Sequence, residues 1–273
     1  MISTEVRSSQ TLTPQARPLL YWTIADALVL AKRHLLQIPR IPDELIFATI
    51  QPIMFVLLFR YVFGGAIAVS GTTYVNFLMA GIFVQTVIFG STSTGIGLAT
   101  DLQRGLIDRF RSLPMAKSAV LTGRTISDLI RNTFVVMVMW TVGLLVGFQP
   151  QGNFFSWLAA AGLLLLTSFA FSWISATIGL LVHSVEAAQS AGFIWLFPLT
   201  FASSAFVPTQ SMPYWLRVFA EHQPVTQIVN ATRGLLLNHP DASTILIAIA
   251  WCVGILVVFI PLAVRQYGRR TAR

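Results

Sequence analysis

The residues best placed to do chemistry form one short charged stretch, 101–114, which reads DLQRGLIDRFRSLP and lies between two long apolar runs. Apolar residues recur in it at helical spacing, at Leu102, Leu106, Phe110 and Leu113. Arg104 and Asp108 are four residues apart, so they can form an ion pair on a helix. The pattern indicates a short amphipathic helix outside a bilayer, which could either transmit force from a soluble partner or simply join two membrane spans.

The ends of this predicted helix have their own signals. Asp101 is a residue type that can cap a helix start, and Pro114 ends a helix at or before the residue that precedes it. We therefore expect the helix to begin at Asp101 and to end before Pro114.

Other catalytic patterns are missing from the sequence. It has no G-x-x-x-x-G-K-[ST] phosphate-binding loop, no H-E-x-x-H motif and no G-x-S-x-G motif. Its four histidines are scattered and do not form a metal-ligand pattern with cysteine or acidic residues. The apolar runs hold almost no ionisable groups, which disfavours an ion-driven transporter. We therefore expect no enzyme activity, no metal site and no cofactor in this chain.

Mild polarity and aromatic side chains remain as candidates for a substrate path through the membrane. Ser168, Ser172 and Ser175 lie at helical spacing on one face, where small residues also serve close helix packing. The other candidates for the path, for which ordinary packing is the alternative, are Gln85, Gln189, Phe197 and Phe201.

The composition predicts that this chain is embedded in a lipid bilayer. The 273 residues are 55% hydrophobic and only 10% charged, and the mean hydropathy is +0.72. The net charge of +8 does not indicate nucleic-acid binding, because the basic residues flank apolar runs. The single cysteine, Cys252, excludes a disulfide framework, and the polar start shows no cleaved signal peptide.

Periodicity and apolar length predict an all-α membrane protein. We expect a disordered tail at 1–18, an amphipathic helix at 19–38 that lies in the membrane interface or caps a soluble face, and a basic tail at 265–273. The transmembrane domain extends over 19–264. Six membrane spans are predicted, at about 45–63, 74–99, 129–148, 154–182, 187–206 and 243–264.

The segment 207–242, before the last span, does not resemble a simple loop. Two short amphipathic helices are predicted there, each with a proline at its start, Pro213 and Pro224. The residues predicted to belong to this outer hairpin are Pro213, Trp215, Pro224 and Arg233. The segment could form a hairpin that re-enters the outer leaflet or an ordinary helical surface loop.

Charge predicts the orientation. Of the 18 Lys and Arg residues, all but Arg60, Arg217 and Arg233 fall on one side of the six predicted spans. The positive-inside rule places that side, with both termini and the charged stretch, in the cytoplasm.

Two motifs resemble those of a known family. The charged stretch resembles the first cytoplasmic loop of type 2 ABC export permeases, whose usual pattern is Gly-Thr-(apolar)-Glu-Arg ending in Pro. Gly105, Arg109 and Pro114 match, whereas Asp108 replaces the usual Glu and Leu106 the usual Thr. The sequence RFRSLPM is similar to the daunorubicin-resistance branch, as are the later segments MPYWL, HQPV and NATRG.

The resemblance implies a permease that dimerises with its own copy or with a sister permease. Each half would bind a separate ABC ATPase, which holds ATP and Mg²⁺. The charged stretch would be the coupling helix that docks on this ATPase, and 19–38 would be the connecting helix beside it. The residues expected to serve the coupling are Asp101, Arg104, Gly105, Asp108, Arg109, Phe110, Arg111 and Pro114.

The sequence and the resemblance together predict a permease subunit of an ABC exporter in the bacterial plasma membrane. Its substrate would be a hydrophobic or amphipathic compound, such as a drug, an antibiotic or a complex lipid. Two alternatives stay open: an exporter of polysaccharide or teichoic-acid precursors, and a membrane scaffold that transports nothing.

Overall fold

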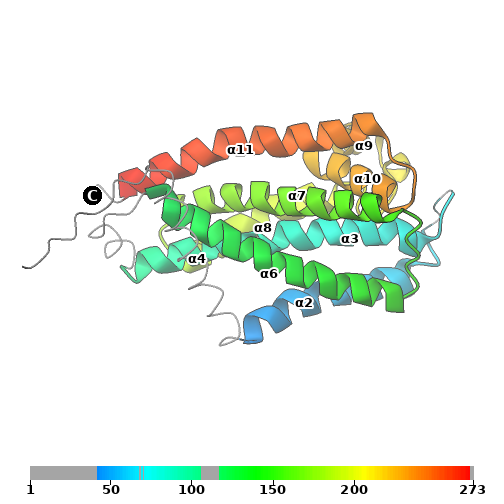
Figure 1. The fold of residues 1–273 in the computed structure, drawn as a ribbon, viewed down its shortest axis with the longest axis horizontal. Coiled ribbons are helices and arrows are strands. Elements are labelled where there is room, and N and C mark those ends of the chain that lie inside the picture. Colours follow the sequence, from blue (N-terminus) through cyan, green and yellow to red (C-terminus); the bar gives the residue numbers. More distant parts are fainter. Residues whose placement is uncertain (1–41, 68, 70, 106–116, 271–273) are drawn as a thin grey trace, which may run out of the picture.

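The computed structural model describes residues 42–67, 69, 71–105 and 117–270. This part of the chain is a bundle of helices whose axes run roughly side by side (Figure 1), and no β-strand occurs in it. The elements are α2 (Pro42–Leu57), the π-helix η2 (Leu58–Phe63), α3 (Tyr74–Gly90), α4 (Thr92–Gln103), α6 (Lys117–Leu145), α7 (Phe154–Leu181), α8 (Val185–Phe201), the 3-10 helix η3 (Thr209–Ser211), α9 (Tyr214–His222), α10 (Pro224–Leu236) and α11 (Ala242–Arg270). The predicted tail at 1–18 and helix at 19–38 lie outside the described residues, as does 106–116.

Helix α3 is the centre of the bundle. Every residue from Tyr74 to Ile88 is buried, which agrees with a sequence that is apolar all around the helix and not on one stripe. It packs against α2, α6, α7 and α10 and is followed in the chain by α4, and α7 also packs along α11. The first core of the protein therefore surrounds α3, and a second, smaller one joins α4 to α7 and α11 around Trp173.

In the part of the chain that the structure describes, four helical segments are long and apolar enough to cross a membrane: Tyr74–Gln103, Leu121–Leu145, Phe154–Leu181 and Ala242–Arg269. They correspond to the predicted second, third, fourth and sixth spans. The predicted first span is a shorter apolar helix, Ala48–Phe63, and the fifth is the 17-residue helix α8. The chain is thus a multi-helix membrane protein, and the number of six spans stays a prediction.

Helix α6 extends beyond the predicted third span at its N-terminal side. It begins at Lys117 and runs without a break to Leu145, whereas the span was predicted to start near Leu129, and that start stays a prediction. The charged residues in the first half of the helix were left out of the predicted span because exposed charges are costly in a bilayer. In the structure these side chains face α4 and pair there, so the helix can continue.

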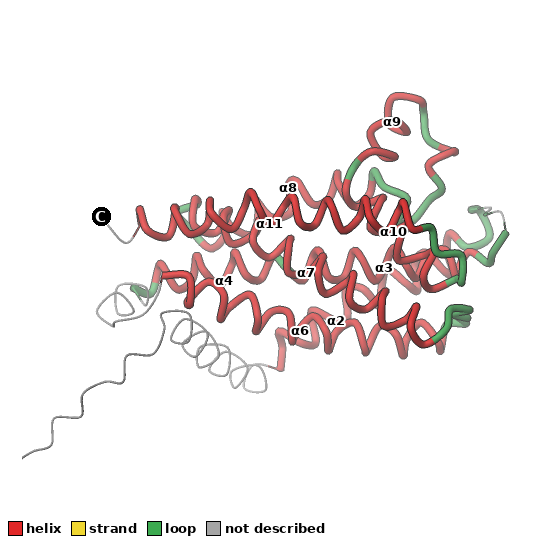
Figure 2. Tube along the Cα trace, turned by 45° about the horizontal axis from the view of Figure 1, so that its top comes forward, coloured by secondary structure: helices red, strands yellow, loops and turns green. Residues whose placement is uncertain are grey.

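The bundle has two distinct ends. One end holds α9 and α10, which follow α8 and precede α11 in the chain; this is called the α10 end here. At the other, the α4 end, α4 leads to the charged stretch and α11 leads to the C-terminus (Figure 1). Helix α10 is buried against α3, α7 and α11, whereas α9 stands out from the body (Figure 2). The two short helices predicted in 207–242 are therefore present, and they differ greatly in burial.

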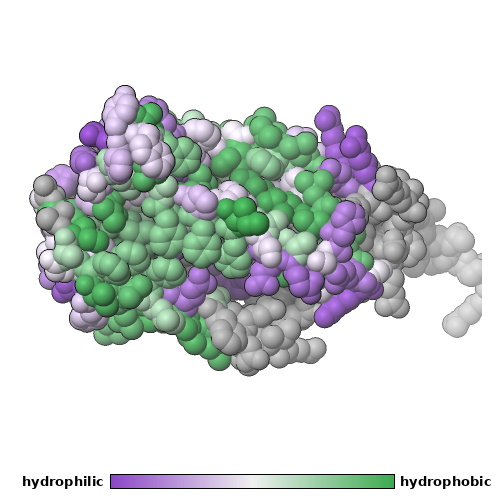
Figure 3. Space-filling view, turned by 180° about the vertical axis from the view of Figure 1, so that it is seen from behind, coloured by the Kyte–Doolittle hydropathy of each residue, from purple (hydrophilic) through white to green (hydrophobic). Residues whose placement is uncertain are grey.

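The outside of the bundle is strongly apolar. Large hydrophobic side chains are exposed along α2, α6, α8 and α11, and one face of the molecule shows a broad hydrophobic area with hydrophilic side chains gathered beyond it at the α4 end (Figure 3). Contiguous apolar surface of this kind is typical of contact with lipid or with another membrane subunit.

Candidate functional site

The site begins at a break between α3 and α4. Ser91, Thr92 and Ser93 each donate a side-chain hydrogen bond to the carbonyl oxygen three residues earlier, over 2.6, 2.7 and 2.8 Å. Such bonds compete with the helical ladder and bend helices. The long apolar run that was predicted as one span, 74–99, is therefore two helices that meet at Ser91.

Arg131 of α6 binds at this break. Its Nη2 donates to the carbonyl oxygen of Gly90 over 2.7 Å and also to Ser93 Oγ. Asp128, one turn earlier, lies 3.6 Å from the same guanidinium nitrogen. The Asp128 carboxylate also accepts hydrogen bonds from Ser93 Oγ and Thr94 Oγ1, over 3.0 and 2.5 Å. A compact ionic cluster thus joins α6 to the α3–α4 break.

A second ion pair lies toward the end of α4. Arg124 Nη1 is 2.7 Å from Asp101 Oδ2, and both side chains are largely buried. The predicted role of Asp101 as the cap of a helix that starts there is wrong, because Asp101 lies in the last turn of α4. The helix ends just beyond it, where Gly105 takes a positive φ of 64° that a residue with a side chain rarely adopts.

These charged residues of α6 were missed as members of a site. Arg124, Asp128 and Arg131 are spaced by four and three residues, so they share one face of the helix. That alternation of charge along one face, directly before an apolar run, was the available signal. It indicates a face that contacts another helix, not a loop.

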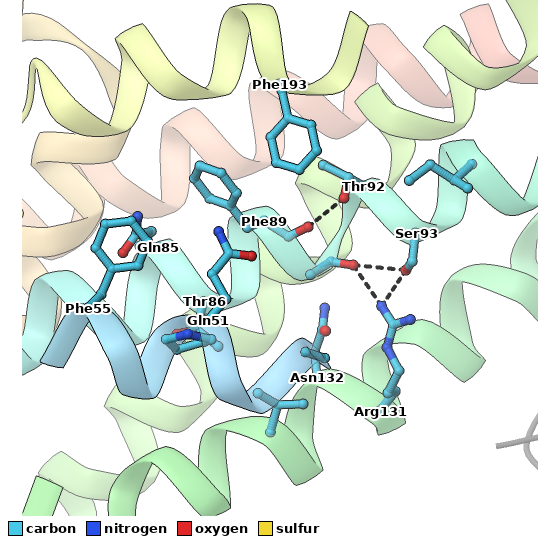
Figure 4. A pocket seen from close by; sticks show the side chains of 15 residues that line it. Gln51, Phe55, Gln85, Thr86, Phe89, Thr92, Ser93, Arg131, Asn132 and Phe193 are labelled. Carbon is cyan, nitrogen blue, oxygen red and sulfur yellow. Dashed lines mark hydrogen bonds between the residues drawn. The ribbon is translucent and has the colours of Figure 1, made fainter. Parts of the chain in front are cut away.

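A cavity of about 280 Å³ lies beside the cluster, between α2, α3, α4, α6 and α8. Arg131 and Asn132 reach it from α6, and Phe89 and Phe193 line it from α3 and α8 (Figure 4). Gln85, a predicted path residue, also lines it and is only 4% exposed. The complete lining is Ala48, Gln51, Pro52, Phe55, Gln85, Thr86, Phe89, Gly90, Thr92, Ser93, Ile96, Arg131, Asn132, Val135 and Phe193.

One row of phenylalanine rings leads from this cavity to the α10 end. Neighbouring ring centroids in the row are between 4.4 and 5.9 Å apart, within the usual range for aromatic pairs. Two predicted path residues belong to it, Phe197 and Phe201, which are 42% and 39% exposed. The members in order are Phe89, Phe193, Phe197, Phe201, Phe206, Phe59 and Phe63.

The serine stripe of α7, which consists of Ser168, Ser172 and Ser175, is buried where α7 packs against neighbouring helices. Ser168 Oγ accepts a hydrogen bond from Asn132 Nδ2 over 2.8 Å. A Cβ added to Gly95 of α4 would lie 2.3 Å from the carbonyl oxygen of Ser175, so the two backbones are nearly in contact. Ser172 and Ser175 are buried and do not line the cavity, as expected from the packing alternative. Gln189, the remaining candidate, is exposed on α8 and is also outside the cavity lining.

The predicted residues at the α10 end fall into two groups. Pro213 and Trp215 are exposed at α9, whereas Pro224 starts α10 and is half-buried. Arg233 is partly buried and donates to the carbonyl oxygens of Phe77 and Ser204, over 3.2 and 2.7 Å. Its guanidinium carbon also lies 3.7 Å from the centre of the Phe77 ring. Arg233 thus ties α10 to α3 and to the segment after α8.

The coupling residues are only partly described. Arg104 is exposed at the end of α4, next to Gly105. Asp108, Arg109, Phe110, Arg111 and Pro114 lie outside the described residues. Within the described ranges, no group of three or more His, Cys, Asp or Glu side chains could hold a metal ion.

Comparison with known proteins gives a consistent result over most of the chain. The ABC-2 type transporter family matches residues 26–237. The daunorubicin resistance ABC transporter permease protein DrrB1 of Streptomyces coeruleorubidus is 32% identical over 96% of this chain and 92% of its own. The probable doxorubicin resistance ABC transporter permease protein DrrC of Mycobacterium tuberculosis is 26% identical over 96% and 95%. A putative transport permease, ycf38 of Pyropia yezoensis, is 26% identical over 87% and 84%. The helices, the apolar exterior and these similarities lead to one conclusion: the chain belongs to the ABC-2 type transporter family, as a membrane transport permease.

Proposed function

We propose that this chain is the membrane subunit of an ATP-driven exporter for a hydrophobic or amphipathic compound. The observation that supports this most is the similarity, over 96% of the chain, to a permease protein named for daunorubicin resistance. The compound would be a drug, an antibiotic or a complex lipid. Energy would come from a separate ABC ATPase, with ATP and Mg²⁺ bound there and not in this chain.

The conformational change of that ATPase would act on this chain through residues 101–114. Arg104 is exposed at the end of α4, and the Asp101–Arg124 pair fastens the same end to α6. A displacement of the charged stretch would therefore move α4 together with α6. The Asp128–Arg131 cluster lies further along the same two helices, so the movement would reach the α3–α4 break and the cavity.

The path of the compound would follow the cavity and the row of phenylalanine rings. All of these rings except Phe206 are at least partly exposed, and they offer large apolar contact area. Such a surface suits aromatic or alkyl groups better than sugars, which need many hydrogen bonds. This favours the drug or lipid class over polysaccharide precursors.

Orientation and assembly follow from the same arrangement. Arg104 caps the end of α4, and Arg265 and Arg269 lie in the last turns of α11; these helix ends are at the α4 end of the bundle (Figure 1), which by the positive-inside rule would face the cytoplasm. Both termini would then be cytoplasmic in a bacterial inner membrane, with six spans in all. The exposed apolar faces of α2 and α8 would contact lipid or a second permease, either a copy or a sister chain.

The test is to purify the chain in mild detergent and to identify the ATPase that accompanies it. A triple substitution of Arg104, Asp108 and Arg109 by alanine should weaken this association and lower substrate-stimulated ATP hydrolysis. Matched substitution of Arg217, an exposed arginine of α9 at the opposite end, should leave the association unchanged. Unchanged association and hydrolysis in the triple variant would contradict the proposed coupling. An inactive scaffold would show association without any ATP-dependent transport in vesicles.

A further inference from the structure

The cavity between α2, α3, α4, α6 and α8 is lined by a buried polar side chain, Gln85, whose hydrogen bonding is incomplete. Gln85 is 4% exposed, and its Nε2 has no hydrogen-bond partner among the described residues. A buried polar group without a partner destabilises the folded state, because it has lost its hydrogen bonds to water. Proteins seldom keep such a group unless it has another use.

Three other polar side chains that line the cavity are already engaged. Thr86 Oγ1 donates to the carbonyl oxygen of Ile82 over 2.7 Å, and Thr92 Oγ1 donates to that of Phe89 over 2.7 Å. Asn132 Nδ2 donates to Ser168 Oγ over 2.8 Å. Gln85 therefore differs from these neighbours, because its carboxamide is the buried amide with a free donor.

Arg131 offers a second free donor at the same cavity. Its Nη2 is used at the α3–α4 break, but its Nε is buried without a partner among the described residues. Arg131 is also the one charged side chain among the described residues that line the cavity. Because Asp128 lies 3.6 Å from the guanidinium, the positive charge is already balanced. The cavity is thus rich in donors without being a strong anion site.

Apart from the exposed Gln51, the remaining wall is apolar. Phe55, Phe89 and Phe193 contribute rings, and Val135 and Pro52 contribute aliphatic surface. Figure 4 shows Phe89 and Phe193 on one side of the cavity and Arg131 and Asn132 projecting from α6 on the other. The volume of about 280 Å³ is near the lower end of small-molecule sites.

We infer that this cavity, within a single subunit, binds an uncharged hydrogen-bond acceptor, a carbonyl or similar oxygen, carried on an aromatic or alkyl body. Gln85 selects the acceptor, and the phenylalanine rings hold the body. This inference rests on the proposed function, because it names the chemical class of compound that the exporter accepts. It adds that a cationic or anionic group is not what the cavity recognises.

The test uses benzophenone, an uncharged aromatic ketone that attaches to neighbouring C–H bonds under ultraviolet light. The full chain, in the complex in which it purifies, is reconstituted in lipid and labelled over a range of benzophenone concentrations. Mass spectrometry of the peptides should find saturable labelling in the segments of α2, α3 and α8 that line the cavity. Labelling only on lipid-exposed faces, without saturation, would overturn the inference.

The variant Gln85→Leu removes the donor with little change in volume. It should raise the benzophenone concentration for half-maximal labelling about fivefold, as expected for one hydrogen bond of roughly 1 kcal/mol. The matched control is Gln151→Leu, an exposed glutamine in the turn before α7. Thermal stability of Gln85→Leu should not fall, because a buried polar group without a partner is removed. Equal labelling of both variants would overturn the assignment of Gln85.

Competition on the unchanged protein tests the chemical class separately. Acetophenone and ethylbenzene have similar shapes, but only acetophenone has a carbonyl oxygen. For each compound, the concentration that halves benzophenone labelling is measured in the unchanged protein and in Gln85→Leu. The ratio of the ethylbenzene value to the acetophenone value should be larger in the unchanged protein than in Gln85→Leu. Partitioning of the compounds into lipid affects both proteins equally, so it cancels in this comparison. Stronger competition by benzoate would show an anion site and contradict the inference. Since labelling needs neither ATP nor transport, its failure leaves the proposed exporter function to be judged by the association and ATPase measurements.

Discussion

Arg124 Nη1 lies 2.7 Å from Asp101 Oδ2, and this contact joins the first half of α6 to the last turn of α4. The side chains are only 18% and 17% exposed, so solvent screens the pair less than a surface ion pair. Its position next to the charged stretch makes it the first contact through which movement of that stretch would reach the bundle.

Reversing one charge of this pair should uncouple the subunit. In Arg124→Asp, two carboxylates would face each other, and we expect weaker substrate-stimulated ATP hydrolysis in the complex. The double variant Asp101→Arg with Arg124→Asp should recover most of that activity, with a coupling energy of about 1 kcal/mol in a double-mutant cycle of stability. Additive losses in the double variant would show that the two residues act independently.

The ionic cluster at the α3–α4 break should matter for stability. Asp128→Asn removes the charge that balances Arg131 and should cost about 3 kcal/mol, at the low end for breaking a buried pair. Thermal unfolding in detergent measures this. Thr94→Val removes one hydrogen bond to the same carboxylate and should cost only about 1 kcal/mol. A Thr94 variant that is less stable than the Asp128 variant would contradict the importance of the charge.

The contact between α4 and α7 should not tolerate a larger residue. A Cβ on Gly179 would lie 2.2 Å from the carbonyl oxygen of Gly95, whereas a Cβ on Gly162 of the same helix would meet nothing within 4 Å. Gly179→Ala should therefore cost about 1–3 kcal/mol through overpacking. Gly162→Ala is the matched control and should be neutral or slightly stabilising, because alanine favours helix. Equal melting temperatures for the two variants would argue against the close approach.

The start of α11 should respond to acid. Asp241 accepts hydrogen bonds from the side chains of Ser243 and Thr244 and from the Thr244 amide, and these bonds lower its pKa from 3.8 to about 2. A depressed pKa means that the carboxylate stabilises the fold fully above about pH 4, and this contribution disappears as the pH falls toward 2. Asp241→Ala should thus lower the melting temperature by a few degrees at pH 7, and the difference should shrink below pH 4. A difference that is independent of pH would contradict the role of the charge.

The helical architecture could be predicted from the sequence because apolar length and periodicity are local properties. The segments around 74–103, 154–181 and 242–270, the two short helices of 207–242 and the packing alternative for Ser175 all follow from such patterns. The family could also be predicted, since the charged stretch carries its own motif.

The site could be predicted only in part, because it depends on contacts between distant helices. Gln85 and two members of the aromatic row were predicted, but nothing local shows that Gln85 faces a cavity while Gln189 does not. The sequence did not show that one continuous helix begins as early as Lys117, because Arg124, Asp128 and Arg131 look costly in a membrane span. Their partners, Asp101, Ser93 and the Gly90 carbonyl, become visible only when α4 is placed beside α6.

ATP-driven transport tests the central proposal most directly. Inside-out membrane vesicles that contain this chain and its co-purifying ATPase are supplied with daunorubicin, the compound in the name of the 32%-identical relative, and uptake is followed by its fluorescence. We predict uptake that requires ATP and that falls sharply when Arg104, Asp108 and Arg109 are replaced by alanine. Uptake that proceeds equally without ATP, or ATP hydrolysis by the purified chain alone, would contradict an exporter driven through its charged stretch.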